Sequence, residues 1–124
     1  MQRALGITAA LIGAAAVMLG AFGAHALRGH LDDSALQIWH TAVEYQFWHV
    51  LALLGIAQRA APGARLWLGS GAAFVVGIVL FSGSLYALAL GAPRWIDFVT
   101  PLGGLALIAG WVLMLVAWYG AARK

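Results

Sequence analysis

The sequence predicts an all-α integral membrane protein, a single domain over residues 1–124 in which four membrane-spanning helices form a bundle. Hydrophobic residues make up 64% of the chain and charged residues 9%, whereas soluble proteins have roughly 45–50% and 25%. A soluble fold of this size cannot bury so much apolar surface, so we expect lipid to be the solvent. Four apolar segments each reach the ~20 residues that a spanning helix needs.

The predicted spans are bounded by helix start and stop signals. Asp32 or Asp33 is placed to cap the start of the second span, and the helix breakers of Ala61–Gly63 precede the third. Thr100 followed by Pro101 favours a helix start, with threonine at the N-cap and proline at the first helical position. The four spans cover about residues 5–26, 34–57, 66–90 and 100–119.

A cleaved secretory signal is the alternative interpretation of the first span. Arg3 precedes the apolar run, and Ala24-His25-Ala26 resembles a cleavage site. The run is about 20 residues long, however, and a signal core has about 7–15. We therefore expect a retained transmembrane helix.

Charge in the loops predicts the orientation of the chain. Four spans place the N-terminus, the second loop and the C-terminus on one side, with five basic residues and no acidic one. The other side holds two basic and three acidic residues. An excess of lysine and arginine marks the cytoplasmic side, so we expect both termini there. The basic residues of the first side are Arg3, Arg59, Arg65, Arg123 and Lys124. The charged residues of the second are Arg28, Arg94, Asp32, Asp33 and Asp97.

The composition also excludes some classes of function. The chain has no cysteine, which rules out disulfides, thiolate catalysis and cysteine metal sites. Its formal charge of +3 comes from seven basic residues scattered among apolar runs, which form no stripe for nucleic acid. Membrane lipids, including anionic ones, are the expected partners.

Polar residues of all four predicted spans fall at a similar depth, in the outer half of the bundle. On a helical wheel at roughly 100° per residue, His40 and Trp48 flank Glu44 on one polar and aromatic face of the second span. The alternating directions of the spans bring small and polar residues of the other three to the same level. This convergence predicts a polar intramembrane pocket that could hold a ligand or a proton. Its candidate residues are His25, Glu44, Tyr45, His49, Ser82, Ser84, Tyr86 and Thr100.

Several segments resemble one known family, the domain-of-unknown-function family 423, over nearly the whole chain. This family comprises small bacterial membrane proteins and is similar to transmembrane protein 256 of eukaryotes. The resemblance implies a small multi-pass protein of the bacterial cytoplasmic (inner) membrane, and it implies no activity. The matching segments are LGAFGAHAL (Leu19 to Leu27), TAVEYQFWH (Thr41 to His49), LFSGSLYALAL (Leu80 to Leu90), VTPLGGL (Val99 to Leu105) and Gly110-Trp111.

Two classes of function remain open. The first is a non-enzymatic membrane component, such as a scaffold, an accessory subunit of a membrane complex or a lipid organiser, in which the polar residues bond one another. The second is a small transporter or binding protein that uses Glu44 and His49 for protons, a metal ion or a small polar ligand. We favour the first, and a homo-oligomer is compatible with either.

Metal and enzyme chemistry find less support. His25, Glu44 and His49, with His40, are of residue types that suit zinc, copper or iron, but they form no compact ligand motif. Ser82 and Ser84 lack the Gly-x-Ser-x-Gly pattern of a nucleophile elbow, which a helical span could not form in any case. We therefore expect neither enzymatic activity nor a cofactor.

Overall fold

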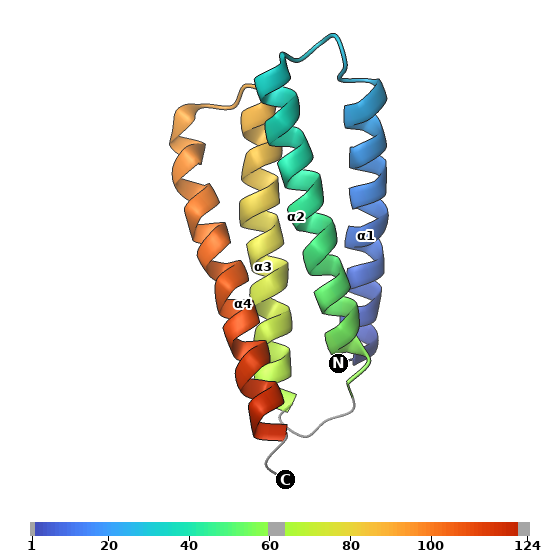
Figure 1. The fold of residues 1–124 in the computed structure, drawn as a ribbon, viewed down its shortest axis with the longest axis vertical. Helices are drawn as coiled ribbons and strands as arrows, with labels where there is room; N and C mark the ends of the chain where they lie inside the picture. The colour runs from blue at the N-terminus through green and yellow to red at the C-terminus, as the bar shows by residue number, and fades with distance from the viewer. Residues whose placement is uncertain (1, 60–63, 122–124) are drawn as a thin grey trace.

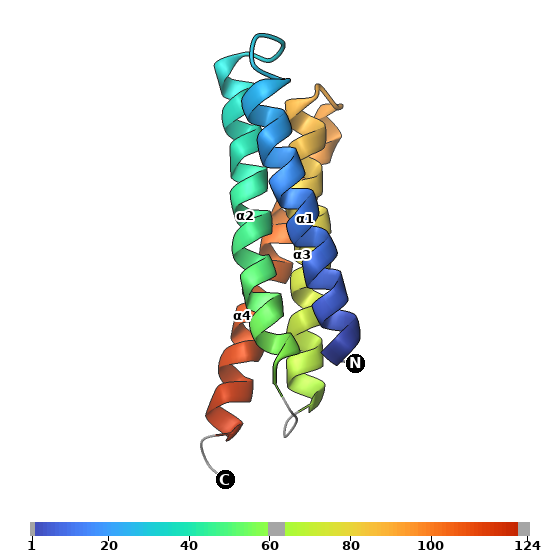
Figure 2. The ribbon, with the colours of Figure 1, turned by 90° about the vertical axis from the view of Figure 1, so that its right-hand side faces the viewer.

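The computed structural model describes residues 2–59 and 64–121 and confirms an all-α helical bundle. The helices run alternately up and down, so both chain ends lie at the same end of the bundle (Figures 1 and 2). The helices are α1 (Gln2–His25), α2 (Asp33–Ala57), α3 (Ala64–Ala89) and α4 (Val99–Ala121), with the short 3-10 helix η1 (Arg94–Phe98) before α4.

Local signals explain where the helices begin and end. Asp32 caps α2, because its side chain accepts a hydrogen bond from the N–H of Ala35 at 2.8 Å. Gly29, in the turn between α1 and α2, has a φ of 86°, which glycine adopts without a steric penalty. The prediction that Thr100 caps the fourth helix is wrong. Helix α4 already begins at Val99, directly after η1, and the Thr100 hydroxyl bonds Ser84 instead.

Helices that follow one another in sequence pack against one another. The main contacts join α1 to α2, α2 to α3 and α3 to α4, and this places α1 and α4 at opposite edges (Figure 1). The pair α2 and α3 is therefore central. Helices α2 and α4 both lie against α3 but are not packed closely on each other.

Glycines bring α3 and α4 close together. A Cβ atom at Gly103 would lie 2.7 Å from the Cα of Phe81, and one at Gly77 would lie 2.9 Å from the backbone N of Leu107. Such small residues allow helix backbones to approach in lipid, where packing rather than water exclusion holds helices together.

Three segments are long and apolar enough to cross a membrane, namely α1, α3 and Arg94–Ala121. Helix α2 has 25 residues, about 37 Å at 1.5 Å per residue, but its polar side chains lower its mean hydropathy. It lies lengthwise between α1 and α3, so its crossing of the membrane stays a prediction that the packing supports. Large hydrophobic side chains cover the outside of the bundle, as expected for a surface in lipid.

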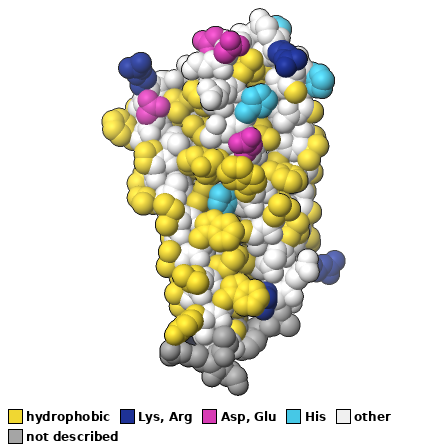
Figure 3. Space-filling view, viewed as in Figure 1, with side chains coloured by type: hydrophobic (Ala, Val, Ile, Leu, Met, Phe, Trp, Pro, Cys, Tyr) yellow, Lys and Arg dark blue, Asp and Glu magenta, His cyan; other side chains and the backbone are white. Residues whose placement is uncertain are grey.

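Most charged side chains lie toward the ends of the bundle, and the mostly hydrophobic zone between them contains an acidic side chain on the face shown in Figure 3. We call the end that carries Arg3, Arg59 and Arg65 the basic end. The opposite end, which carries the segments 26–32 and 90–98, has charges of both signs.

Candidate functional site

Gln46 is the centre of a hydrogen-bond network that joins three helices. Its side chain is 5% exposed. Its Nε2 donates to the backbone oxygen of Ile12 in α1 at 2.9 Å. Its Oε1 accepts from the hydroxyl of Tyr86 in α3 at 2.7 Å. Both ends of the amide are thus used within the protein, and one residue of α2 connects α1 to α3.

Serine hydroxyls form further links between helices. The Oγ of Ser82 donates to the backbone oxygen of Ala42 in α2 at 2.7 Å, and that of Ser70 donates to Gly110 in α4 at 2.7 Å. The Oγ of Ser84 lies 2.9 Å from the backbone oxygen of Phe81 in its own helix and 2.6 Å from the hydroxyl of Thr100. All three serines are buried.

His49 joins α2 to α4 through a ring whose protonation state follows from its partners. The indole N–H of Trp111 donates to Nε2 at 3.1 Å, and Nδ1 lies 2.6 Å from the backbone oxygen of Tyr45. An indole N–H can only donate, so Nε2 accepts, and the proton of the neutral ring is on Nδ1. The ring also lies beside Phe74, at 5.4 Å between centroids. His49 is therefore a core histidine with both ring nitrogens hydrogen-bonded within the protein.

The predicted pocket residues do not come together in one place. The structure pairs Ser84 with Thr100, and it gives Ser82, Tyr86 and His49 separate partners. Tyr45 is partly buried, with its ring 4.6 Å from that of Phe81.

Glu44 and His25 lie outside this network. Both side chains are exposed, His25 at the end of α1 and Glu44 midway along α2. Neither has a hydrogen bond or ion pair with any residue of the described ranges. Within the described part of the chain, no three histidine or acidic side chains are grouped closely enough to hold a metal ion. The structure thus does not gather His25, Glu44 and His49 into a ligand set.

Three polar residues of the network, Gln46, Ser70 and Trp111, were missing from the sequence-based set. Gln46 falls between the polar and apolar faces of its helix, and Ser70 lies near the start of α3, away from the outer half in which the polar pocket was predicted. The sequence signal that could have identified them is a polar side chain within an apolar span, because such a side chain needs a hydrogen-bond partner inside the membrane. The identity of that partner depends on helix packing and could not be read from one segment.

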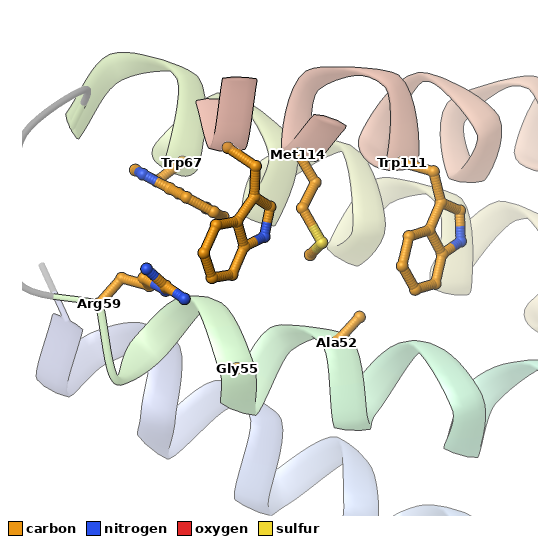
Figure 4. Close-up of a pocket in the computed structure, with 7 residues that line it drawn as sticks. Ala52, Gly55, Arg59, Trp67, Trp111 and Met114 are labelled. Carbon is orange, nitrogen blue, oxygen red and sulfur yellow. The ribbon is translucent and has the colours of Figure 1, made fainter. Parts of the chain in front are cut away.

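Two apolar hollows lie between α2 and α4, with α3 as their floor, and Trp111 lines both of them; we call them together the α2–α4 groove. Its wider part has a volume of about 480 Å³ and its narrower part about 210 Å³. Figure 3 shows this face, on which a histidine lies among hydrophobic side chains. The wider part is lined by Tyr45, Trp48, His49, Phe81, Gly104, Leu107, Ile108 and Trp111. The narrower part is lined by Ala52, Gly55, Arg59, Trp67, Trp111, Met114 and Trp118, and Figure 4 shows how they face one another.

The groove ends at Arg59, on the basic end of the bundle. The guanidinium carbon of Arg59 lies 3.4 Å from the ring centroid of Trp118 and 5.4 Å from that of Trp67. The two indoles are 5.6 Å apart and nearly perpendicular, so they cradle the cation. The backbone oxygen of Arg59 accepts a hydrogen bond from the side-chain amide of Gln2. None of the guanidinium N–H groups has a hydrogen-bond partner in the described part of the chain.

Four helices, three of them apolar over a membrane-spanning length, define a multi-pass membrane protein. The model of the family described as "Protein of unknown function (DUF423)" matches residues 19–104. The UPF0382 inner membrane protein YgdD of Escherichia coli K12 is 44% identical over 124 residues, which cover 99% of this chain and 95% of that protein. The UPF0382 membrane protein YwdK of Bacillus subtilis is 45% identical over 104 residues, 82% of this chain and 85% of YwdK. The chain belongs to the DUF423 family, as its motifs predicted. No solved structure matches it.

Proposed function

We propose that this protein is a non-enzymatic membrane component, a scaffold or accessory subunit that acts through contacts made by its surface. The observation that carries the proposal is that the buried polar side chains already have hydrogen-bond partners within the protein. Among the described residues, no buried side-chain nitrogen or oxygen lacks a hydrogen-bond partner. A transporter needs interior polar groups that exchange partners with its substrate, whereas these groups hold helices together.

The exposed position of Glu44 supports a contact with another membrane protein. Glu44 is the twelfth residue of α2, about 17 Å from the start of a helix of about 37 Å. A charged carboxylate that faces lipid near mid-membrane costs about 2.5–3.5 kcal/mol on insertion scales. A polar group from a neighbouring helix would offset this cost. We therefore place the partner, a second copy or another subunit, against the Glu44 face of α2.

Cross-linking tests this interface directly, because the natural chain has no cysteine. Leu51 lies seven residues after Glu44, on the same face of the helix, and is 55% exposed. We expect Leu51→Cys to form a cross-linked species in native membranes, and the added change Glu44→Gln to reduce it. Leu115→Cys, 68% exposed on α4, is the matched control and should cross-link less. Equal cross-linking at both positions would refute the interface.

Flux measurements separate the scaffold from the transporter. Purified protein in liposomes should pass protons and divalent metal ions no faster than protein-free liposomes. Glu44→Gln keeps the shape and much of the hydrogen bonding of the side chain but removes its charge, and it should leave the melting temperature unchanged. A flux that the wild type shows and this variant loses would overturn the scaffold in favour of a carrier that uses Glu44.

We further propose that both termini face the cytoplasm of a bacterial cell. The excess of arginine at the basic end supports this orientation. The printed name of the Escherichia coli relative, an inner membrane protein, supports the location. A reporter enzyme that is active only outside the cytoplasm, fused after residue 124, should be inactive. The same reporter inserted after Gly29 should be active, and the reverse pattern would invert the orientation.

A further inference from the structure

We propose that the α2–α4 groove binds one acyl chain of an anionic phospholipid, whose phosphate is held by Arg59. This inference goes beyond the scaffold function and does not depend on it. A scaffold can lack the lipid site, and the lipid site can exist in a protein with another role.

The groove results from the way in which α2 and α4 pack on α3. Helices α2 and α4 both pack on α3, and the bond from Trp111 to His49 is the hydrogen bond that joins them across the gap in the described chain. Small residues, Ala52 and Gly55 on one wall and Gly104 on the other, leave the space. The remaining lining is mostly aromatic and aliphatic. Empty space beside such walls forfeits dispersion contacts, and a flexible hydrocarbon chain restores them.

The two parts of the groove together extend over at least the thickness of one leaflet's hydrocarbon layer. Tyr45 lines one end of the groove, and Arg59, two residues after the end of α2, lines the other. At 1.5 Å per residue, α2 from Tyr45 to its end at Ala57 extends about 18 Å, and half of a ~30 Å hydrocarbon core is about 15 Å. An acyl chain whose headgroup lies at Arg59 would therefore fill the narrower part of the groove and extend past Trp111 toward the middle of the membrane.

Charge selects which end of the groove holds the headgroup. The described residues of the basic end include Arg3, Arg59 and Arg65 and no acidic residue, whereas Asp32 and Asp97 lie at the opposite end. Arginine binds phosphate oxygens through paired N–H groups and stacks on aromatic rings at the same time. Arg59 has the aromatic contacts, to Trp67 and Trp118, and its N–H groups are not used by the described protein. An anionic headgroup complements this arrangement.

Native mass spectrometry of the full-length protein, delipidated and then titrated with phosphatidylglycerol, tests the proposal. We expect one phosphatidylglycerol to be retained per chain, with phosphatidylcholine retained more weakly. Arg59→Gln should weaken phosphatidylglycerol binding about tenfold, as expected for the loss of a charge-assisted contact. Arg65→Gln is the matched control, an exposed arginine at the same end that does not line the groove, and should bind like the wild type.

A second pair of variants tests the acyl site without changing charge. A Cβ at Gly55 meets no atom within 4 Å, so Gly55→Leu fills the groove while the helices stay in place. This variant should lose the bound lipid and keep the helical content and melting temperature of the wild type. Gly83→Leu is the matched control, because Gly83 also has open space but lines another surface hollow, and it should keep the lipid.

Three results would overturn the proposal. Unchanged phosphatidylglycerol binding in Gly55→Leu would place the lipid elsewhere. Equal retention of phosphatidylcholine and phosphatidylglycerol, with no effect of Arg59→Gln, would contradict the proposed contact between Arg59 and the headgroup. A lipid-free dimer that Gly55→Leu dissociates would assign the groove to a second copy. None of these results bears on the flux or Glu44 cross-linking tests, so the two proposals fail separately.

Discussion

The adjacent glycines Gly103 and Gly104 offer a sharp test of how α3 and α4 are held together. A Cβ added at Gly103 would lie 2.7 Å from the Cα of Phe81 and 2.8 Å from the carbonyl carbon of Leu80. These are backbone atoms, which cannot turn aside as a side chain does. A Cβ added at Gly104 would first meet the ring of Phe81 at 3.8 Å, an ordinary contact distance.

Two opposing effects set the expected magnitudes. Replacing a helical glycine with alanine stabilises a helix by about 0.8–1 kcal/mol. Gly104→Ala should therefore raise the free energy of unfolding slightly. In Gly103→Ala the clash forces α4 away from α3, and overpacking of this kind costs about 1–3 kcal/mol. The gain in helix propensity is common to both variants and cancels in the comparison, so we expect them to differ by the overpacking cost alone, about 1–3 kcal/mol.

Reversible unfolding in mixed detergent micelles, followed by circular dichroism, measures this difference. Both variants carry the same substitution one residue apart, so changes in composition, expression tag and micelle cancel. Gly103→Ala should unfold at a lower denaturant fraction than the wild type, and Gly104→Ala at an equal or higher one. Equal shifts in the two variants would refute the close approach of α4 to the backbone of α3.

Three further changes test other parts of the structure. Gln46→Leu and Tyr86→Phe should each destabilise the bundle, and a double-mutant cycle should give a coupling energy of about 0.6 kcal/mol and at most about 1.7 kcal/mol, the average and the maximum that such cycles give for hydrogen bonds in a helical membrane protein. Additive effects would contradict the bond between them. Trp111→Phe leaves Nε2 of His49 without its donor, and we expect a loss of about 1–3 kcal/mol in the same assay; wild-type stability would contradict the bond. Asp32→Ala removes the N-cap of α2 and should cost about 0.5–2 kcal/mol; an unchanged unfolding midpoint would show that the cap is not needed.

The sequence predicted the helical fold because the relevant signals are local. Apolar runs of membrane-spanning length and the acidic cap before α2 can each be recognised in one continuous stretch of sequence, without knowledge of the packing. The start of α4 was harder to place. Thr100-Pro101 reads as a start signal, but η1 carries the chain into a helical path at Val99 before that point is reached. The 3-10 turn depends on how 94–98 packs against α3, which the local pattern does not contain.

The candidate site was predicted only in part, since depth and facing direction are separate properties. Alternating helix directions correctly bring Ser84 beside Thr100 and Ser82 beside α2. A helical wheel shows which residues share a face of one helix, but it does not show which face the neighbouring helices cover, because packing decides that. The polar face centred on Glu44 was therefore expected to point inward, whereas Glu44 lies on the surface and Gln46 is buried.

The composition of α2 follows from its place in the bundle. Its residues make side-chain hydrogen bonds to every other long helix. Trp39 and Gln46 donate to backbone oxygens of α1, Gln46 accepts from Tyr86 of α3, and His49 accepts from Trp111 of α4. Gln46 and His49, two of the polar residues that lower the mean hydropathy of α2, are thus among those that join the helices, whereas the exposed Glu44 is not. A helix of this kind is least favourable in lipid by itself and most favourable between partners, because each unbonded polar group in hydrocarbon is costly. The buried Gln46 and His49 therefore both weaken the membrane signal of α2 and suit its central position.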